Sequence, residues 1–341
     1  MNITVVPARQ VPDIFVRRLK NRQPGEAAFV TSMSAWFDNN PITDNLVNYG
    51  FAGDILALDY FGHWHGITPT RFMKKFHKST RNEFKRNFSG TYMVIGAPPK
   101  INFTNSTILN RSHIKAYAVG GRVLSLGGVN CTPPSYDFID VMLDFESPAF
   151  IKRLKELVGL GARIREGGIG ETFRLDAQNE ILIDYGHRKN WLGLGNRSII
   201  MDNLLADLKV DLVSATLSST SMPTGKLDDL LVGHLHAGRK VRVYANHPSK
   251  FRPPHSSGYE RLLHRAYALT AKTPWIDNVP DKLNHLKAAI ITYSSGSKVA
   301  YVGSHNFNAL HVWAGNTEVC LRTKDESVVG QLEEFITDNL A

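Results

Sequence analysis

The sequence predicts an α/β protein made of two similar halves, each with a mixed sheet flanked by helices. Apolar runs of strand length alternate with longer amphipathic runs of helical period, a pattern typical of sheets that helices cover on both faces. A combination of His-x-Lys, an apolar run and a glycine-containing turn ending in asparagine also occurs twice. Such internal repetition indicates a duplicated architecture.

The first copy of the combination covers residues 113–130. His113 and Lys115 precede an apolar run, and Gly-Gly-Val-Asn at 127–130 ends it with Asn130. The run has the length and composition of a strand, and its glycines allow a tight turn or a close approach of the backbone.

The second copy covers residues 285–306. His285 and Lys287 precede the apolar run, and Gly-Ser-His-Asn at 303–306 ends it with Asn306. A third His-x-Lys, beginning at His187, has no such turn after it, because positions 201 and 204 are Met and Leu. Two complete copies with similar surroundings are therefore a much stronger signal than His-x-Lys alone.

The two copies lie about half a chain apart, so we expect a first half over 1–170 and a second over 171–341, joined in the glycine-rich segment 159–171. Similar predicted elements surround each copy. In the first half a strand, a helix and a strand are expected before the copy, at 55–60, 72–88 and 91–97. In the second half the same three elements are expected at 210–218, 226–240 and 240–246, each equivalent to the first-half element in the same position. A strand headed by an acid and then a helix are expected after it, within 138–158 and 316–336.

The repeated residue types suit chemistry on a phosphodiester. Residues two apart on a strand share a face, so each copy presents an imidazole and an ammonium together. One neutral histidine can attack phosphorus to form a phosphohistidine, while the other, protonated, gives its proton to the departing oxygen. Lysines and asparagines can hold the non-bridging oxygens, and an acid behind each histidine can fix its tautomer. The candidate catalytic residues are His113, Lys115, Asn130, Asp140, His285, Lys287, Asn306 and Glu318.

At this level of detail the chain resembles two-motif members of the phospholipase D superfamily. Asn110-Arg111-Ser112-His113 and the first Gly-Gly-x-Asn are similar to the motifs of bacterial cardiolipin synthases, as is the second Gly-Ser-x-Asn. The resemblance implies two phospholipase D-like α/β sandwich halves with one active site at their interface and a covalent phosphohistidine. It also implies that His113 attacks and that His285 is the acid and base. The arrangement of residues itself requires no metal, and we expect neither a metal nor a cofactor.

The chain departs from that family's motif at two positions. The motif aspartate is replaced by Gly120 in the first copy and by Thr292 in the second, and the second copy has about four more residues between its strands, around Ser294–Lys298. A longer hairpin in the second half would accommodate both facts and keep the site residues in register.

The net charge of +9 favours an anionic partner. The expected substrates are an anionic phospholipid and an alcohol or water acceptor, in a phosphatidyltransferase or phospholipase reaction. A nuclease or other non-lipid phosphodiesterase is the first alternative, and a pseudoenzyme that binds phosphate esters is the second. With no apolar run near 18 residues and no signal-peptide pattern, we expect a cytoplasmic chain that can meet the inner face of the membrane peripherally.

Four other segments have both a structural and a functional interpretation. We expect the helix at 71–88 to pack its phenylalanines on the sheet, and its basic face can also meet lipid headgroups or nucleic acid. Segment 11–22 is expected to be a helix packed on the domain rather than on a membrane surface. Segment 246–267 is a candidate loop for acceptor selection, and HWH at 63–65 can line the pocket. Cys131 and Cys320 are expected to be buried thiols.

Overall fold

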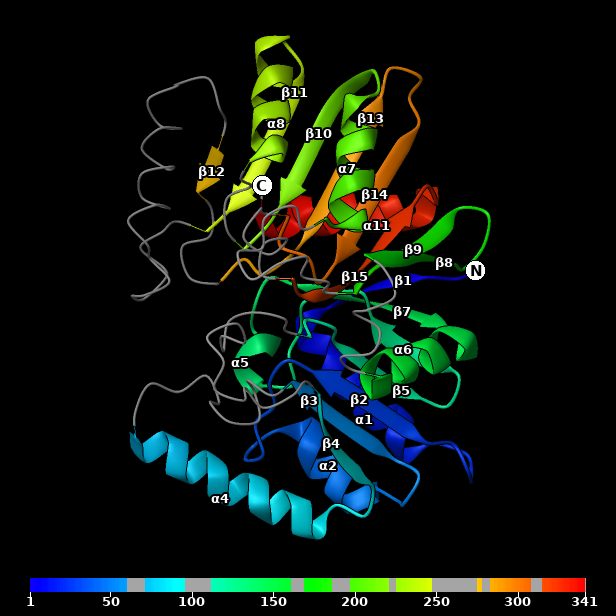
Figure 1. The fold of residues 1–341 in the computed structure, drawn as a ribbon, viewed down its shortest axis with the longest axis vertical. Coiled ribbons are helices and arrows are strands. Elements are labelled where there is room, and N and C mark those ends of the chain that lie inside the picture. The colour runs from blue at the N-terminus through cyan, green and yellow to red at the C-terminus, as the bar shows by residue number, and fades with distance from the viewer. Residues whose placement is uncertain are drawn as a thin grey trace.

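The structure is a computed structural model, and it describes residues 1–59, 71–95, 112–160, 169–185, 197–220, 225–246, 275–277, 283–307 and 315–340. Within these residues the chain forms two mixed sheets with helices on both faces, one sheet in each half (Figure 1). The predicted fold class is therefore confirmed. Among the described helices, none is both long enough and apolar enough to cross a membrane.

The first sheet contains seven strands in the order β1-β7-β6-β5-β2-β3-β4. Strands β2, β3 and β4 run parallel, and the remaining neighbours pair antiparallel. The strands are β1 (Thr4–Pro7), β2 (Ala28–Ser32), β3 (Ile55–Asp59), β4 (Thr91–Ile95), β5 (Ala116–Val119), β6 (Arg122–Ser125) and β7 (Val141–Glu146).

The second sheet contains eight strands in the order β12-β11-β10-β13-β14-β15-β9-β8. Strands β10, β11 and β12 run parallel, as β2, β3 and β4 do in the first sheet. The strands are β8 (Gly170–Arg174), β9 (Asn179–Tyr185), β10 (Leu212–Ser218), β11 (Lys240–Ala245), β12 (Trp275–Asp277), β13 (Ala288–Tyr293), β14 (Lys298–Gly303) and β15 (Thr317–Thr323). Apart from the edge strand β8, the order repeats that of the first sheet.

The strand order corrects the predicted pairing of elements between the halves. The strands expected at 55–60 and 210–218 form as β3 and β10, but they are not equivalent. Strand β10 pairs antiparallel with β13 and parallel with β11, whereas β2 has the corresponding partners β5 and β3. Equivalent pairs are therefore β2 with β10 and β3 with β11. The prediction missed β2, a short fully buried strand with polar Thr and Ser, and so shifted the first half by one unit.

The helices form three layers around the sheets. The described helices are α1 (Val11–Lys20), α2 (Pro41–Tyr49), α4 (Arg71–Asn87), α5 (Pro133–Tyr136), α6 (Pro148–Leu160), α7 (Ile199–Lys209), α8 (Lys226–His236) and α11 (Glu326–Leu340), with a 3-10 turn η1 (Ala8–Gln10). Helices α6 and α11 share one core cluster with residues of both sheets. Helices α1, α2 and α4 cover the other face of the first sheet, and α7 and α8 cover that of the second.

The helices at 11–22 and 71–88 behave largely as expected. Val11, Phe15 and Leu19 of α1 are buried in the first-half core, so the apolar side of α1 packs on the domain. Phe84 and Phe88 of α4 are buried in the same core, while the basic residues described at its C-terminal end include exposed ones. The predicted packing of Phe72 and Phe76 lies outside the described side chains.

The hairpins within the two motifs differ as expected. Gly120 and Gly121 alone join β5 to β6, and Gly120 adopts φ of 60°, a left-handed conformation that favours glycine. In the second half β13 continues through Thr292, which pairs with Lys298 before a turn over 294–297. The longer hairpin is confirmed.

The acid-headed strands and the following helices also form where the sequence predicts them, as β7 with α6 and β15 with α11. Residues 161–168 lie outside the described part of the chain, so the boundary near residue 170 stays a prediction. Cys131 and Cys320 are buried free thiols, as expected, and burial raises the pKa of the Cys131 thiol to about 12.

Candidate active site

The two His-x-Lys segments lie immediately before β5 and β13, and each pairs with the acid-bearing segment of the other half. The backbone N–H of His113 donates to the carbonyl oxygen of Thr317 at 2.9 Å, and that of His285 donates to Ile139 at 2.9 Å. These two parallel bridges interleave the halves at the backbone level. The site is therefore fixed by the interface between the halves.

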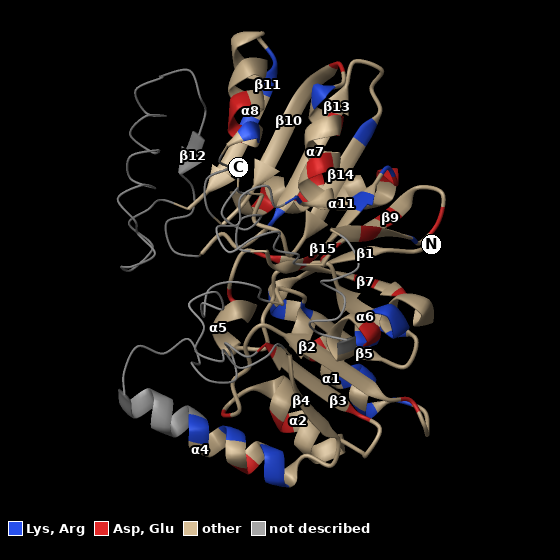
Figure 2. Ribbon diagram, in the orientation of Figure 1, with Lys and Arg blue, Asp and Glu red and all other residues tan. Residues whose placement is uncertain are grey.

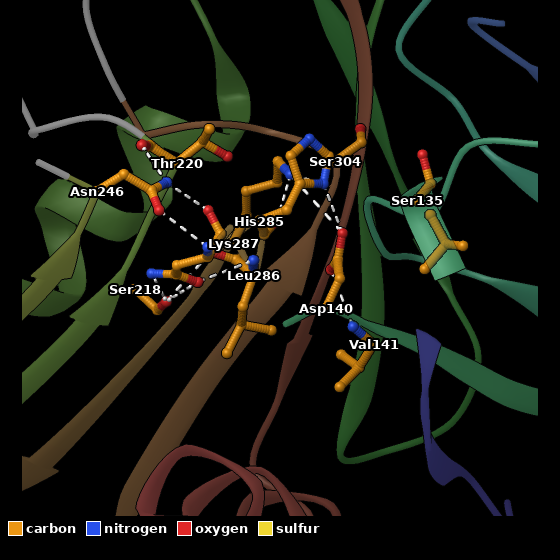
Figure 3. A network of polar contacts seen from close by, with 12 residues as sticks. Ser135, Asp140, Val141, Ser218, Thr220, Asn246, His285, Leu286, Lys287 and Ser304 are labelled. Carbon is orange, nitrogen blue, oxygen red and sulfur yellow. Dashed lines mark hydrogen bonds and ion pairs between the residues drawn. The ribbon is translucent and has the colours of Figure 1, made fainter. Parts of the chain in front are cut away.

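Asp140 orients the second-half histidine. Its Oδ2 lies 2.6 Å from Nδ1 of His285, and its Oδ1 accepts the backbone N–H of Val141 at 2.9 Å (Figure 3). The Nζ of Lys287 also lies close, 2.8 Å from Nδ1 of His285 and 3.9 Å from Oδ2 of Asp140. Because both contacts use Nδ1, Nε2 is the ring nitrogen available for chemistry.

Glu318 orients the first-half histidine. Its Oε1 lies 2.8 Å from Nδ1 of His113, and its Oε2 accepts the hydroxyl of Ser304 at 2.5 Å. The carboxylate is almost fully buried, whereas the side chain of His113 is 14% exposed and that of His285 is 17% exposed. Each ring is thus held on its buried side while one edge remains accessible.

Gly128 has no room for a side chain. A Cβ built at this position would lie 2.3 Å from Oδ2 of Asp140, 2.6 Å from Nζ of Lys287 and 2.8 Å from Nδ1 of His285. The equivalent position in the second motif is Ser304, whose hydroxyl contacts Glu318 instead. The Gly-Gly and Gly-Ser turns therefore support two differently built half-sites.

The lysines and asparagines of the motifs lie in the same region. Lys115 and Lys287 are 3% and 1% exposed, and each is close enough to Asp140 and Glu318 for their charges to act on it. Asn130 is buried and accepts the hydroxyl of Ser32 at 3.3 Å through its Oδ1. The backbone carbonyl of Asn306 accepts the hydroxyl of Ser219 at 2.6 Å.

Burial and neighbouring charge shift the pKa values of the site. Burial first, and then the Lys287 ammonium, lower the pKa of His285 to about 4 although Asp140 opposes the shift. Burial also lowers the pKa of Lys287 to about 7 and lowers that of Lys115. Burial and the neighbouring ammonium group thus favour the neutral form of the His285 ring.

Sequence reasoning missed the residues that hold the His-x-Lys segments in place. Oδ2 of Asp59 accepts the backbone N–H of Ser112 at 2.9 Å, and Oδ1 of Asn246 accepts that of Asn284 at 2.9 Å. Asn246 also donates from Nδ2 to the carbonyl oxygens of Thr220 and Asn284. The available signal was a polar residue at the end of a buried strand, at the carboxyl edge where ligand-binding residues of α/β sheets gather.

Two other candidate segments cannot be placed. Positions 63–65 and 247–267 lie outside the described residues. Within the part of the chain that the structure describes, no group of three or more His, Cys, Asp or Glu side chains could hold a metal ion.

The chain is similar to known proteins in structure. No family model matches the chain, and no curated protein matches its sequence. Its structure is similar to phosphatidylserine synthase from Haemophilus influenzae, with 12% identity, a TM-score of 0.68, and coverage of 98% of this chain and 85% of that one. At 12% identity this likeness shows a shared fold, and that fold agrees with the one that the resemblance to the phospholipase D superfamily implied.

Two further solved structures share the fold. Yeast tyrosyl-DNA phosphodiesterase is 11% identical with a TM-score of 0.51, and the match covers 95% of this chain and 89% of that one. Polyphosphate kinase from Porphyromonas gingivalis is 11% identical with a TM-score of 0.59, and the match covers 98% of this chain but only 49% of the kinase.

Proposed function

We propose that this chain is a phospholipase D-type phosphodiesterase that transfers phosphatidyl groups through a covalent phosphohistidine. The observation that carries the proposal is the pair of crossed contacts, His113 with Glu318 and His285 with Asp140, placed around two buried lysines. Two oriented imidazoles supply a nucleophile and an acid, and the lysines supply positive charge for the non-bridging oxygens. These are the parts that displacement at phosphorus requires.

Lys115, Lys287, Asn130 and Asn306 are proposed to bind the phosphate. The two ammonium groups would neutralise the charge that develops on the phosphoryl oxygens, and a low local dielectric would strengthen that effect. An arriving phosphate would in turn raise the pKa of Lys287, because an anion beside it favours the protonated form.

The proposed substrate is a phospholipid, and the proposed reaction class is transfer to an alcohol, as in cardiolipin synthases, or to water. The similarity to a phosphatidylserine synthase has a higher TM-score than that to tyrosyl-DNA phosphodiesterase, 0.68 against 0.51, which favours lipid. The residue pattern of the first motif, with Asn110-Arg111 before it and Gly-Gly-x-Asn at its end, favours the cardiolipin-synthase-like branch.

A nuclease or other non-lipid phosphodiesterase is the second candidate. The observations in its favour are the net charge of +9 and the fold shared with tyrosyl-DNA phosphodiesterase. The same two-histidine site would serve a nucleic-acid phosphodiester, so only the substrate distinguishes the two candidates.

Loss of the motif aspartates does not favour a pseudoenzyme. Gly120 lies in the turn at the far end of β5 from Lys115, and Thr292 lies near the far end of β13 from Lys287. Four or five residues of strand separate each position from its lysine, about 13–17 Å. These replacements therefore change the hairpins and not the groups that would touch phosphate.

Peripheral contact with an anionic membrane is proposed to involve α4. Lys78, Lys85 and Arg86 are exposed on this helix, and Figure 2 shows α4 at the outer edge of the first half, with Lys and Arg positions coloured blue along its described part. Basic residues near an anionic leaflet each contribute about 1 kcal/mol of attraction.

The test is to incubate purified protein with phosphatidylglycerol vesicles and, separately, with single- and double-stranded DNA, all with EDTA, and to identify products by mass spectrometry. Cardiolipin or phosphatidic acid, absent with His113→Ala and with His285→Ala, is the expected result. Cleaved DNA with intact lipid would move the assignment to the second candidate. A folded protein that leaves every substrate intact would contradict both.

A further inference from the structure

The duplicated fold allows the surroundings of the two histidines to be compared position by position. Thr31 of β2 lies opposite Ala116 and beside Ala57, and Ser218 of β10 lies opposite Ala288 and beside Tyr244. Because Ala116 and Ala288 follow the two motif lysines, Ala57 and Tyr244 are equivalent. Two residues further along, Asp59 is therefore the counterpart of Asn246.

Asp59 and Asn246 accept equivalent hydrogen bonds, but Asp59 is an acid and Asn246 is a neutral amide. Each accepts, at 2.9 Å, the backbone N–H of the residue immediately before the catalytic histidine. Both side chains are buried, Asp59 at 1% and Asn246 at 5% exposure. The segment that carries His113 thus has a buried carboxylate beneath it, where the segment that carries His285 has a neutral amide.

A second pair of equivalent positions has the same bias. Asp184 of β9 lies opposite Glu318 of β15 in the backbone register of the sheet. In the first half, β1 pairs with β7 as β9 pairs with β15 in the second. The backbone N–H of Ala8 donates to the carbonyl oxygen of Asp140 at 2.9 Å, so Ala8 is the counterpart of Asp184. The Asp184 carboxyl group accepts the Ser198 hydroxyl at 2.5 Å and the Ile199 N–H at 2.8 Å, and burial raises its pKa to about 7, so it adds only part of a negative charge near Glu318. An alanine stands at the corresponding place beside Asp140.

The ammonium group of Lys287 acts directly on the ring of His285. Its Nζ lies 2.8 Å from Nδ1 of His285, in the space that Gly128 leaves open. An ammonium at this distance disfavours a second positive charge on the ring. The charged groups that act on His285 are Asp140, which favours an imidazolium, and Lys287 and Lys115, which oppose it.

We propose that His285 is the histidine that attacks phosphorus and that His113 is the acid that protonates the departing oxygen. This inference rests on the proposed phosphatidyl transfer, and it reverses the order that the family resemblance implies. Asp59 acts as a positioning residue, since it holds the His113 segment and contributes negative charge without touching the substrate. The low pKa of His285 is consistent with this order.

The proposed transfer has two steps, formation and breakdown of the phosphohistidine. Nε2 of neutral His285 bonds to phosphorus, the bond from phosphorus to the leaving oxygen breaks, and that oxygen takes the proton of His113. The acceptor alcohol or water then gives its proton to His113 as its oxygen bonds to phosphorus and the P–N bond breaks. Both histidines return to their starting states.

The test uses a phosphatidyl ester of 4-nitrophenol, whose leaving group needs no protonation. With His113→Ala, attack by His285 should release about one equivalent of nitrophenolate and leave a phosphatidyl group on the peptide that contains His285, because the base for the second step is missing. His285→Ala should release none. Peptide mass spectrometry locates the adduct.

Each other outcome overturns something definite. An adduct on His113 in His285→Ala, with none in His113→Ala, would reverse the assignment and leave the proposed function intact. Turnover by the wild type with an adduct in neither variant would overturn the covalent route and the assignment together. A wild type inactive on this ester and on phosphatidylglycerol would overturn the proposed function itself.

Asp59→Asn provides an independent test, because asparagine can still accept the Ser112 N–H. Removing the charge should slow transfer from phosphatidylglycerol, whose alkoxide leaving group needs the acid, by about tenfold or more. The rate of nitrophenolate release should change less than threefold. Equal slowing of both substrates would indicate a merely structural role and contradict the assignment of Asp59.

Discussion

Nδ1 of His285 lies 2.6 Å from Oδ2 of Asp140, a residue of the opposite half of the chain. The contact between His113 and Glu318, at 2.8 Å, crosses the interface in the other direction. Each half therefore supplies the acid that orients the other half's histidine, and neither half contains a complete pair. Duplication in this chain produces one shared site instead of two separate ones.

The first prediction concerns Asp140. Asp140→Asn preserves the shape of the side chain but removes the charge that fixes the His285 tautomer and faces Lys287 at 3.9 Å. We expect kcat for phosphatidyl transfer to fall by about 10²- to 10⁴-fold, because a histidine whose tautomer is no longer fixed is a poor nucleophile. Steady-state kinetics measures this, with circular dichroism to confirm folding. A loss below threefold would contradict the orienting role of Asp140.

The second prediction concerns Gly128. Gly128→Ala would place a Cβ 2.3 Å from Asp140 Oδ2 and 2.6 Å from Lys287 Nζ, so these two groups must move. We expect loss of most activity and destabilisation by about 1–3 kcal/mol, as for other overpacked sites. Urea unfolding and product formation measure the two effects.

Gly233→Ala is the matched control for that substitution. Gly233 lies within α8, and a Cβ there would meet nothing within 4 Å. We expect full activity and a stability gain of up to about 1 kcal/mol, because alanine is the better helix former. Similar activity losses in both variants would mean that the crowding at Gly128 is not the cause.

The placement of the motif residues in the candidate site was partly predictable, because these residues lie at fixed spacing in a repeated motif. Each His-x-Lys pair lies just before a strand, and the two-residue spacing of an extended chain predicts that its two side chains lie together. The crossed pairing with Asp140 and Glu318 was not predictable, since it depends on how the two sheets meet. Sequence spacing carries no information on that long-range geometry.

The fold shows the same division between local and long-range information. The hairpin difference between Gly120 and Thr292 was predictable from motif length and turn chemistry. The equivalence of β2 with β10 was not predictable, because several buried strands look alike in sequence. Only the order of the strands in each sheet shows which strands are equivalent. Asp59 and Asn246 escaped notice for this reason, as their correspondence becomes visible only through strand register.

The third prediction concerns the pH dependence of stability. The pKa of His285 is lowered from 6.5 to about 4, so the unfolded chain binds this proton more readily than the folded chain. Stability should therefore be lost as pH falls from 6.5 toward 4, by about 3 kcal/mol at most for this group. Lys287, lowered from 10.5 to about 7, titrates above this window.

The comparison that isolates this contribution is wild type against His285→Gln in urea unfolding at several pH values between 4 and 7. Other groups contribute to both proteins and largely cancel in the difference. We expect the stability of the wild type to fall relative to the variant as the solution is acidified. Parallel curves would show that His285 keeps an ordinary pKa in the folded protein.

The last prediction concerns the basic surface of α4. Lys78 and Arg86 are exposed on this helix, whereas Lys85 packs over the ring of Tyr92 at 4.4 Å and is best left in place. Lys78→Glu with Arg86→Glu should weaken binding to phosphatidylglycerol vesicles by at least about tenfold, since each basic residue near an anionic surface contributes about 1 kcal/mol. Vesicle co-sedimentation at low and physiological salt measures this.

Lys226→Glu with Lys240→Glu is the matched control, because it makes the same change of charge on two exposed lysines of the second half. Lys226 is the first residue of α8, and Lys240 is the first residue of β11. If α4 meets the membrane, this control should bind almost as well as the wild type at physiological salt, where charges far from the surface are screened. Equal weakening of both variants would show that vesicle binding follows net charge alone. Unchanged binding of the α4 variant would place the membrane contact elsewhere on the chain.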